Sequence, residues 1–344
     1  MGPERLSALR VVAGASPVEV IETHMSWVFL AGDQVLKLKK PVRYPFLDFS
    51  TLEAREACCR EEVRLNQRLA PGVYRGLMVL QERDGRLALR EEGEAATGRT
   101  VDWLVWMKRL PREQMLDRRL AMGRVEPAEL DALVAVLSTF YRDALRIAPD
   151  PAAYGARFER EHAVDRELLL RPQFQVPGAA PALDRFERAL RQGRGLLQAR
   201  AEQGRIVDGH GDLRPEHVCL LDPPVVIDCL EFNAALRQVD PFDELAFLAL
   251  ECDMAGAAWI GPRLVAGCAA ALQDAPPAAL LHLYTAGRAL LRARLAIAHL
   301  LDPRPRTPER WPPQAQRYVT RALCALDAFE RGDAFSVAMP GGCP

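Results

Sequence analysis

Short apolar runs bounded by turn-forming residues recur in the N-terminal third of the chain, a pattern typical of β-strands. Residues 28–30 and 35–38 form two such runs around the turn-forming residues 31–34, which predicts a hairpin. Residues 77–80 and 87–89 are also predicted to be strands, and the segment 101–110 begins as another. We therefore predict a small antiparallel sheet in this part of the chain.

Apolar residues recur at helical spacing in one segment of this third and in most of the remaining chain. Residues 50–70 predict a helix that Ser50 or Thr51 would cap. The other predicted helices are residues 126–146, 157–170, 183–203, 278–301 and 314–329. The chain is thus predicted to be an α+β protein, with a β-rich part in residues 1–110 and a helical part in residues 111–344.

Length and composition exclude several classes of protein. At 344 residues, with 49% hydrophobic residues, the chain is long enough for two packed domains. A formal net charge of −1 gives no electrostatic reason to bind nucleic acid or an anionic membrane. The sequence contains no uninterrupted run of about 18 apolar residues, so no membrane-spanning helix is expected. The first residues, MGPERLSALR, lack the apolar core of a signal peptide, so we expect a cytoplasmic protein.

The eight cysteines are scattered without the CxxC spacing of zinc sites. Neither a structural zinc site nor a disulfide framework is expected from them. We predict buried thiols in a reducing compartment.

Two carboxylates in the window 207–232 stand where a site would need them. Asp212 lies in a polar turn between two apolar runs, and Asp228 follows the short apolar run 225–227, where a buried strand would end. A carboxylate in a tight loop, followed 16 residues later by one at a strand end, is the layout of a phosphoryl-transfer site. The first would orient a nucleophilic hydroxyl, and the second would hold Mg²⁺ against phosphates.

Lysine is rare in this chain, and its positions are therefore informative. Only four of the 45 basic residues are lysines, and three of these are Lys37, Lys39 and Lys40. Lys37 and Lys39 alternate with leucines, so both side chains are expected on one face of a strand. An ammonium group is a compact charge that fits between phosphate oxygens and a carboxylate.

The run from His210 to His217 resembles the catalytic loop of the protein-kinase-like fold, in the His-Gly-Asp form of its aminoglycoside and choline phosphotransferase branch. The resemblance implies a bilobal fold with Asp212 as catalytic base and Arg214 as a contact of the transferring phosphoryl group. It also implies that Asp228 binds the metal. His217 departs from the pattern, because the family has a metal-binding Asn there; Mg²⁺ prefers oxygen ligands, and Mn²⁺ is the alternative.

The same resemblance assigns roles in the N-terminal lobe. Lys37 would contact the α- and β-phosphates of ATP, with Lys39 as the alternative, and Glu62 of the predicted helix would pair with that lysine, with Glu61 as the alternative. The turn at His24-Met25-Ser26 replaces a glycine-rich loop, which leaves Ser26 as the phosphate contact. The linker 107–111, which begins at Met107, would meet the adenine edge through backbone groups.

Further motifs narrow the resemblance to small-molecule enzymes. Asp240 and Glu244 match a segment of this fold that braces the catalytic loop from a helix start. About twelve residues separate Asp228 from Asp240, too few for the activation segment of a regulated protein kinase. Residues 228–233 (DCLEFN), with the segments 23–26 and 35–41, resemble a bacterial family of aminoglycoside-phosphotransferase-like proteins. Glu231 and Asn233 in the first of these runs would support a second ion or the substrate. Longer members of that family continue into a P-loop domain.

The resulting hypothesis is ATP-dependent phosphorylation of a hydroxyl on a small molecule, with Mg²⁺ or Mn²⁺. The alternative is a pseudokinase that binds nucleotide as a sensor or docks a protein partner, which His217 and the glycine-poor loop favour. A third possibility is transfer of AMP, which would release pyrophosphate. The sequence does not identify the acceptor molecule.

Overall fold

The computed structural model describes residues 18–44, 47–303 and 305–335, so the N-terminal segment MGPERLSALR and Cys343 lie outside the described residues. The chain packs as two compact units. Unit 1 comprises the described residues up to Arg118 together with Glu216–Arg237, and unit 2 comprises Arg119–Pro215 and the described residues from Gln238 onward. The lobe boundary expected at residue 110 stays a prediction. Unit 1 continues to Arg118 and also contains the later segment Glu216–Arg237.

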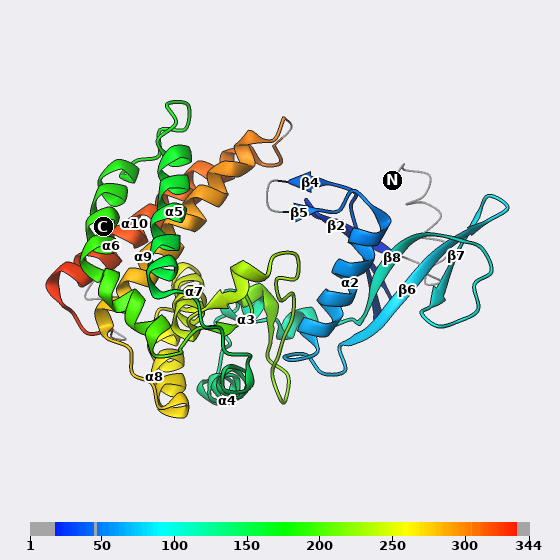
Figure 1. Ribbon diagram of the computed structural model, residues 1–344, viewed down its shortest axis with the longest axis horizontal. Helices are drawn as coiled ribbons and strands as arrows, with labels where there is room; N and C mark the ends of the chain where they lie inside the picture. The colour runs from blue at the N-terminus through cyan, green and yellow to red at the C-terminus, as the bar shows by residue number, and fades with distance from the viewer. Residues whose placement is uncertain (1–17, 45–46, 304, 336–344) are drawn as a thin grey trace. The chain divides into compact units, whose positions relative to one another are not determined.

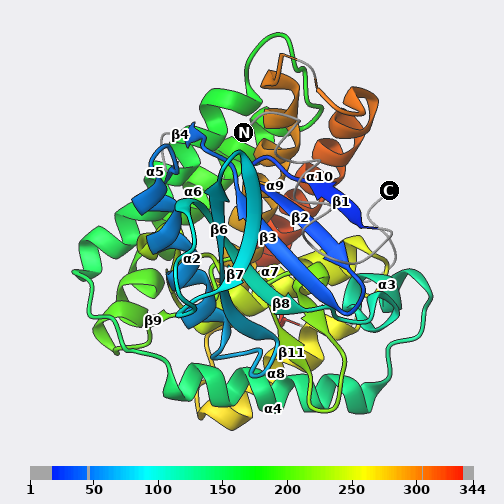
Figure 2. The same cartoon turned by 90° about the vertical axis from the view of Figure 1, so that its right-hand side faces the viewer.

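Unit 1 is built on a six-stranded antiparallel sheet with the order β1-β2-β3-β8-β6-β7, which Figure 2 shows from its broad side. Its strands are β1 (Glu19–Glu22), β2 (Ser26–Ala31), β3 (Gln34–Lys39), β6 (Tyr74–Arg83), β7 (Arg86–Glu91) and β8 (Arg99–Lys108). The shorter pairs are β4 (Arg43–Tyr44) with β5 (Leu47–Asp48), and β10 (Val218–Cys219) with β11 (Val225–Val226). The hairpin predicted for residues 28–38 is confirmed as β2 and β3, and the other predicted strands correspond to β6, β7 and β8.

One helix, α2 (Leu52–Asn66), packs against β6 and β8 (Figure 1). It begins as predicted, because the Thr51 hydroxyl accepts a hydrogen bond from the Ala54 N–H at 3.1 Å. The buried guanidinium of Arg55 donates two hydrogen bonds to the carboxylate of Asp102 on β8, at 2.8 and 3.1 Å. This ion pair and the apolar contacts around Cys59 fix the register of the helix against the sheet.

Unit 2 is mainly helical, as predicted. Its long helices are α4 (Pro127–Asp143), α5 (Pro151–Leu169), α6 (Ala179–Glu202), α7 (Pro241–Met254), α8 (Ile260–Leu272), α9 (Ala278–Ala298) and α10 (Trp311–Arg331). A short pair of strands, β9 (Val207–Asp208) and β12 (Gln238–Val239), stands beside them, and the short helix α3 (Leu116–Ala121) spans the boundary between the units. α8 was not predicted, and α5 begins six residues earlier than predicted because Asp150 caps it and Pro151 starts it. The α+β class is confirmed, with an antiparallel sheet in unit 1 and mainly helices in unit 2.

Most of the cysteines that the structure describes are buried free thiols. Six cysteines are free and buried: Cys58, Cys59, Cys219, Cys229, Cys252 and Cys268. Cys324 is disulfide-bonded, so the expectation of thiols was wrong at this position. Among the described residues, no helix combines the length and apolar character needed to cross a membrane.

Candidate functional site

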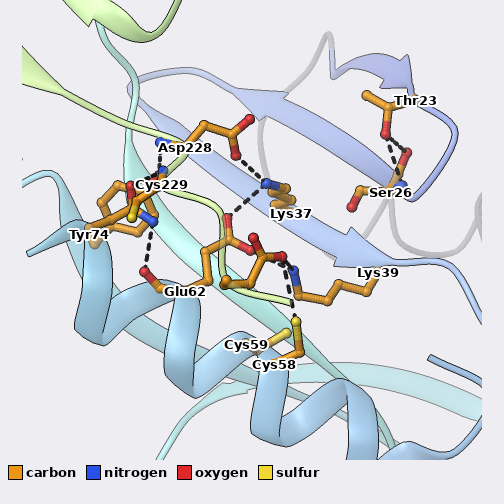
Figure 3. Close-up of polar contacts among 12 residues, drawn as sticks. Thr23, Ser26, Lys37, Lys39, Cys58, Cys59, Glu62, Tyr74, Asp228 and Cys229 are labelled. Carbon is orange, nitrogen blue, oxygen red and sulfur yellow. Dashed lines mark hydrogen bonds and ion pairs between the residues drawn. The ribbon is translucent and has the colours of Figure 1, made fainter. Parts of the chain in front are cut away.

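Lys37 on β3 joins two carboxylates that come from distant parts of unit 1. Its Nζ donates to Glu62 Oε1 on α2 at 2.9 Å and to Asp228 Oδ1 at 2.7 Å (Figure 3). The lysine side chain is 16% exposed, whereas that of Glu62 is 0% exposed. The structure therefore brings together three residues that the sequence assigned to one site, across 191 positions of chain between Lys37 and Asp228.

Lys39, two residues further along the same face of β3, forms a second bridge. Its Nζ donates to Glu62 Oε2 at 2.6 Å and also bonds to Glu231 Oε1. The Lys39 side chain is 1% exposed. Each oxygen of the Glu62 carboxylate thus has its own ammonium group. Glu231, expected to support an ion or the substrate, is paired with Lys39.

The charges of this cluster stabilise one another against the cost of burial. Burial opposes ionisation of Glu62, but the ammonium groups of Lys37 and Lys39 outweigh it and hold the pKa of Glu62 below its ordinary value. Burial likewise opposes the charge on both lysines. The carboxylates of Asp228, Glu62 and Glu231 nevertheless raise the pKa of Lys37 well above the ordinary value, and those of Glu231 and Glu62 do the same for Lys39. Glu62, Lys37 and Lys39 are therefore ionised at neutral pH in the folded protein.

The choice between Glu62 and Glu61 is decided by the helix register. Glu61 lies on the solvent side of α2, where it bonds to Arg64 at 2.6 Å and lies 3.4 Å from Arg237. Glu62 points toward β3 and is fully buried. Neighbouring positions on a helix face directions about 100° apart, so only one of the two can reach the lysines.

Asp228 adopts a backbone conformation that is rare for a residue with a side chain. Its φ is 61°, in the left-handed region. The hydroxyl of Tyr74 on β6 accepts the Asp228 N–H at 3.1 Å, and Asn66 Oδ1 at the end of α2 accepts the following N–H, that of Cys229, at 2.8 Å. These contacts hold the turn against a strain of about 1–3 kcal/mol. Such strain is common where a side chain must be aimed at a site.

The Asp228 carboxylate is 43% exposed, the most open group of the cluster. Partial burial acts to raise its pKa, and the positive charge of Lys37 more than offsets this, so the pKa of Asp228 lies far below its ordinary range. A permanently ionised, accessible carboxylate is a suitable ligand for a hard cation.

His217 lies beside this carboxylate. Its Nε2 is 3.5 Å from Asp228 Oδ2, and its backbone oxygen accepts the Ile227 N–H at 2.9 Å. Within the described ranges, no group of three or more His, Cys, Asp or Glu side chains is arranged to hold a metal ion. A magnesium ion here would depend on one carboxylate together with substrate phosphates, which is a common way for proteins to bind it.

Ser26 and Met107 lie in regular strand structure. Ser26 begins β2 and is buried, and its N–H donates to the Thr23 hydroxyl at 2.9 Å. Met107 lies in β8, which continues to Lys108, so the predicted linker starts two residues too early. The Lys108 and Arg109 N–H groups donate to the backbone oxygens of Val73 and Asp33, at 2.8 and 2.7 Å.

The predicted catalytic residues Asp212 and Arg214 lie in unit 2, close to each other. Arg214 Nη2 is 2.9 Å from Asp212 Oδ2. The loop that carries them starts after β9, which pairs with β12. The sequence therefore places an acid and a guanidinium on one short loop, and the structure joins them as an ion pair.

Glu244 on α7 holds the start of this loop through hydrogen bonds to its backbone. Its carboxylate accepts the N–H groups of His210 (3.1 Å) and Gly211 and the hydroxyl of Tyr141 (2.9 Å). Complete burial raises the pKa of Glu244, although these donors act in the opposite direction. The preceding Gly209 is packed so tightly that a Cβ would lie 2.6 Å from Val239 and 2.7 Å from Glu244.

Asp240 forms the second brace. It caps α7 by accepting the Phe242 N–H at 3.0 Å, and it also accepts bonds from Arg200 Nε at 2.6 Å and from the Tyr284 hydroxyl at 2.9 Å. The sequence indicated bracing roles for Asp240 and Glu244 but not their partners. Tyr141, Arg200 and Tyr284 occur in ordinary amphipathic helices, where the local sequence contains no sign of a buried polar contact.

Comparison with known proteins places this geometry in context. No protein-family model matches the chain. Uncharacterised proteins of Mycobacterium tuberculosis and Mycobacterium bovis are 35% identical over 295 residues, in matches covering 84% of this chain and 56% of theirs. The chain thus spans about half the length of the curated relatives it matches.

Solved structures of small-molecule kinases match nearly the whole chain. A choline/ethanolamine kinase family protein from Mesorhizobium loti has a TM-score of 0.54 at 16% identity, covering 96% of this chain and 97% of its own. Plasmodium vivax ethanolamine kinase has 0.55 at 9% identity, covering 95% and 87%. The aminoglycoside phosphotransferase APH(4)-Ia, in a ternary complex with AMP-PNP and hygromycin B, has 0.53 at 12% identity, covering 95% and 99%.

The chain has the protein-kinase-like fold. The resemblance inferred from the His-Gly-Asp loop is thereby confirmed for the fold. Lys37, Glu62 and Asp228 belong to unit 1, which contains the six-stranded sheet. The loop with Asp212 belongs to unit 2, which is mainly helical.

Proposed function

We propose that this protein is a kinase that transfers the γ-phosphoryl group of ATP to a hydroxyl of a small molecule. The observation that carries the proposal is the double contact of Lys37, at 2.9 Å from Glu62 and 2.7 Å from Asp228. A lysine held between a helix carboxylate and a strained, exposed carboxylate is the arrangement that positions nucleotide phosphates next to a metal ligand. A purely structural ion pair would not need the strained backbone of Asp228.

In this proposal each charged residue of unit 1 has a defined task. Lys37 binds the α- and β-phosphates, Glu62 keeps its ammonium group in place, and Lys39 secures Glu62 from the other side. Ser26 contributes a phosphate contact, and the backbone near Met107 meets the adenine. Asp228 binds Mg²⁺, which would neutralise phosphate charge during transfer. Its low pKa and 43% exposure fit that ligand role.

The loop of unit 2 supplies the acceptor chemistry. Asp212 orients the acceptor hydroxyl and takes its proton as the O–P bond forms, while ADP leaves with the bonding electron pair. Arg214, already 2.9 Å from Asp212, supplies positive charge toward the transferring group. Fixed positive charge is effective in this reaction because negative charge is spread over the phosphoryl oxygens.

The solved structures with this fold support a small-molecule acceptor. They are kinases for choline or ethanolamine and a phosphotransferase for aminoglycosides. The AMP-PNP complex of one of them supports ATP as the donor. Their acceptors do not transfer to this chain, because the identities are 9–16%.

A second candidate, a nucleotide-binding module without turnover, is favoured by one observation. His217 stands 3.5 Å from Asp228, where the family provides a second oxygen ligand for metal. An imidazole is a poor ligand for Mg²⁺ and a better one for Mn²⁺. In this case ATP binding would occur and would alter stability or partner binding without phosphoryl transfer.

One experiment separates the two candidates. The purified chain is incubated with ATP and either Mg²⁺ or Mn²⁺, with and without pools of hydroxyl-containing metabolites, and release of ADP and pyrophosphate is measured. The kinase proposal expects acceptor-dependent ADP release that Asp212→Asn abolishes while nucleotide binding persists. Binding of ATP without ADP release under any condition would support the pseudokinase, and pyrophosphate release would indicate AMP transfer.

A further inference from the structure

Unit 2 contains a cavity of about 220 Å³ that has no part in the proposed reaction. Its lining includes three arginines from two segments. Arg142 at the end of α4 and Arg146 just after it form one pair, and Arg205 precedes β9. Tyr141, Gln273 and Asp274 line it as well. Three guanidinium groups around one small cavity are unusual, because their mutual repulsion needs compensation.

The carboxylate in the cavity does not provide that compensation in full. Asp274 is bound from behind by Arg200, whose two Nη groups donate to it at 2.8 and 2.6 Å. Arg205 Nε stands 3.6 Å from Asp274 Oδ2, beyond hydrogen-bonding distance. With three arginines and one aspartate, the lining has a net charge of about +2. The carbonyl end of α8 also faces it, but a helix terminus contributes only about half a negative charge.

The arginines keep hydrogen-bond donors available. Arg205 Nε is a buried donor without a hydrogen-bond partner among the residues that the structure describes. Arg142 makes one long bond, from Nη2 to the Ala271 oxygen at 3.4 Å. The exposed side chain of Arg146 forms no ion pair with any described residue. An unsatisfied buried N–H costs free energy, which a ligand oxygen would recover.

We propose that this cavity is a binding site for a phosphate group, distinct from the proposed nucleotide site. The planar guanidinium donates two parallel hydrogen bonds to phosphate oxygens, and convergent arginines recognise phosphate more tightly than a single one. Pockets that bind drug-sized ligands measure about 300–1,000 Å³. A cavity of about 220 Å³ therefore suits inorganic phosphate or the phosphate end of a small metabolite.

The lining connects this site to both braces of the Asp212 loop. Tyr141 donates to Glu244, which holds the His210 and Gly211 N–H groups, and Asp274 holds Arg200, which binds Asp240. An anion that draws Arg205 away from Asp274 therefore changes the charge around Asp274, and with it the contact from Asp274 through Arg200 to Asp240. We assign the site a regulatory role on this ground; that role, unlike phosphate binding, rests on the proposed kinase function.

Binding is tested by titrating inorganic phosphate into the intact chain at constant ionic strength, by calorimetry, without nucleotide. The Arg142→Gln/Arg205→Gln variant is expected to bind at least tenfold more weakly than the unmodified protein. Arg188→Gln, which changes an exposed arginine of α6 without an ion pair among the described residues, is the matched control and should bind normally. Lys37→Met should also bind normally, which separates this cavity from the nucleotide site.

Several outcomes would overturn the proposal. These are non-saturable phosphate binding by the unmodified protein, equal binding by the double variant and Arg188→Gln, and loss of binding in Lys37→Met. If the double variant does not fold, Arg146→Gln takes its place, because that exposed side chain has no packing role. Glycerol 3-phosphate distinguishes the sources: tighter binding than inorganic phosphate identifies a phosphate ester as the ligand, and weaker binding identifies the free anion.

The regulatory role has its own readout. Saturating phosphate should change acceptor-dependent ADP release at least twofold in the unmodified protein and in Arg188→Gln, and leave the double variant unchanged. An unchanged rate with intact phosphate binding would overturn the regulatory role alone. Absence of any ADP release would count against the proposed function and leave the binding result standing.

Discussion

Glu62 in unit 1 and Glu244 in unit 2 are both fully buried glutamates, yet their pKa values are shifted in opposite directions. Glu62 is bound by two lysine ammonium groups, and its pKa is lowered. Glu244 is bound by two backbone N–H groups and a tyrosine hydroxyl, and its pKa is raised because burial outweighs these neutral donors. The difference shows which of the two networks can exchange its partners.

A lysine can turn away on its flexible stem, whereas a backbone N–H cannot. Lys37 is 16% exposed and already shared between Glu62 and Asp228, so it can move toward an incoming phosphate. Glu62 would then keep Lys39, which is 1% exposed. In unit 1, Lys37 can therefore exchange its carboxylate partners for a phosphate while Lys39 and Glu62 stay paired. In unit 2, the contacts of Glu244 hold the loop in one conformation.

The largest predicted effect concerns the loop that Glu244 holds. Asp212→Asn should lower acceptor-dependent turnover by about 10²- to 10⁴-fold, because the amide cannot take the hydroxyl proton. Nucleotide binding, measured by calorimetry, should change little, since Asp212 lies outside the lysine cluster. Turnover equal to that of the unmodified protein would contradict the role of Asp212.

The two lysines of β3 should respond differently to the same substitution. Lys39→Met leaves two buried carboxylates with too few partners and should lower the free energy of unfolding by about 3–5 kcal/mol. Lys37→Met should cost less stability, because its site is partly open to water, and should weaken ATP binding at least tenfold. Urea unfolding and nucleotide titration of both variants test this. The reverse pattern would show that Lys39 is the nucleotide ligand.

The rigidity of the Glu244 network is tested at Gly209. Gly209→Ala forces a Cβ against Val239 and Glu244 and should lower the free energy of unfolding by about 1–3 kcal/mol. Gly195→Ala is the control, because nothing lies within 4 Å of a Cβ at this position in α6. The control should gain about 0.5–1 kcal/mol from better helix propensity. Equal stability of the two variants, measured by urea unfolding, would show that the loop adapts.

The opposite pKa shifts predict opposite pH dependences, which are the smallest of the expected effects. The folded-state pKa of Glu62 is lowered, so its contribution to stability is present above the unfolded value of about 4.3 and is lost as the pH falls further. The folded-state pKa of Glu244 is raised, so its contribution is complete below about 4.3 and is lost as the pH rises through the folded-state value.

Urea unfolding between pH 3 and pH 7 measures both. Glu62→Gln should flatten the loss of stability on the acid side, and Glu244→Gln should flatten the loss on the neutral side. Glu159→Gln, at a partly exposed position of α5, controls for the change in net charge. Parallel profiles for the first two variants would show that the pKa values of Glu62 and Glu244 are not shifted in opposite directions.

Much of unit 1 could be predicted from sequence because its signals are local. The two-residue period of β3 places Lys37 and Lys39 on one face, and the helical period of α2 separates Glu61 from Glu62. The sharing of Glu62 by both lysines could not be predicted, since it depends on how closely α2 packs against the sheet. The buried Arg55–Asp102 pair that fixes this distance joins residues 47 positions apart.

The conformation of Asp228 was beyond local signals for a similar reason. The partners that hold its turn, Tyr74 and Asn66, lie more than 150 positions earlier in the chain. Likewise, the pattern of α4 predicts a helix but gives no sign that Tyr141 donates to Glu244 across 103 positions. Long-range polar contacts need the folded geometry, because many other acceptors are compatible with the same local pattern.

The division of the chain has a practical consequence for dissecting this protein. The polypeptide leaves unit 1 after Arg118, returns at Glu216 and leaves again after Arg237. A fragment cut near residue 118 would carry Lys37, Lys39 and Glu62, but it would lose the ion pairs to Asp228 and Glu231, which would stay on the other piece. No single scission releases unit 1 whole. Excision would need Glu216–Arg237 to be spliced onto the first fragment, so variants in the full chain are the appropriate tools.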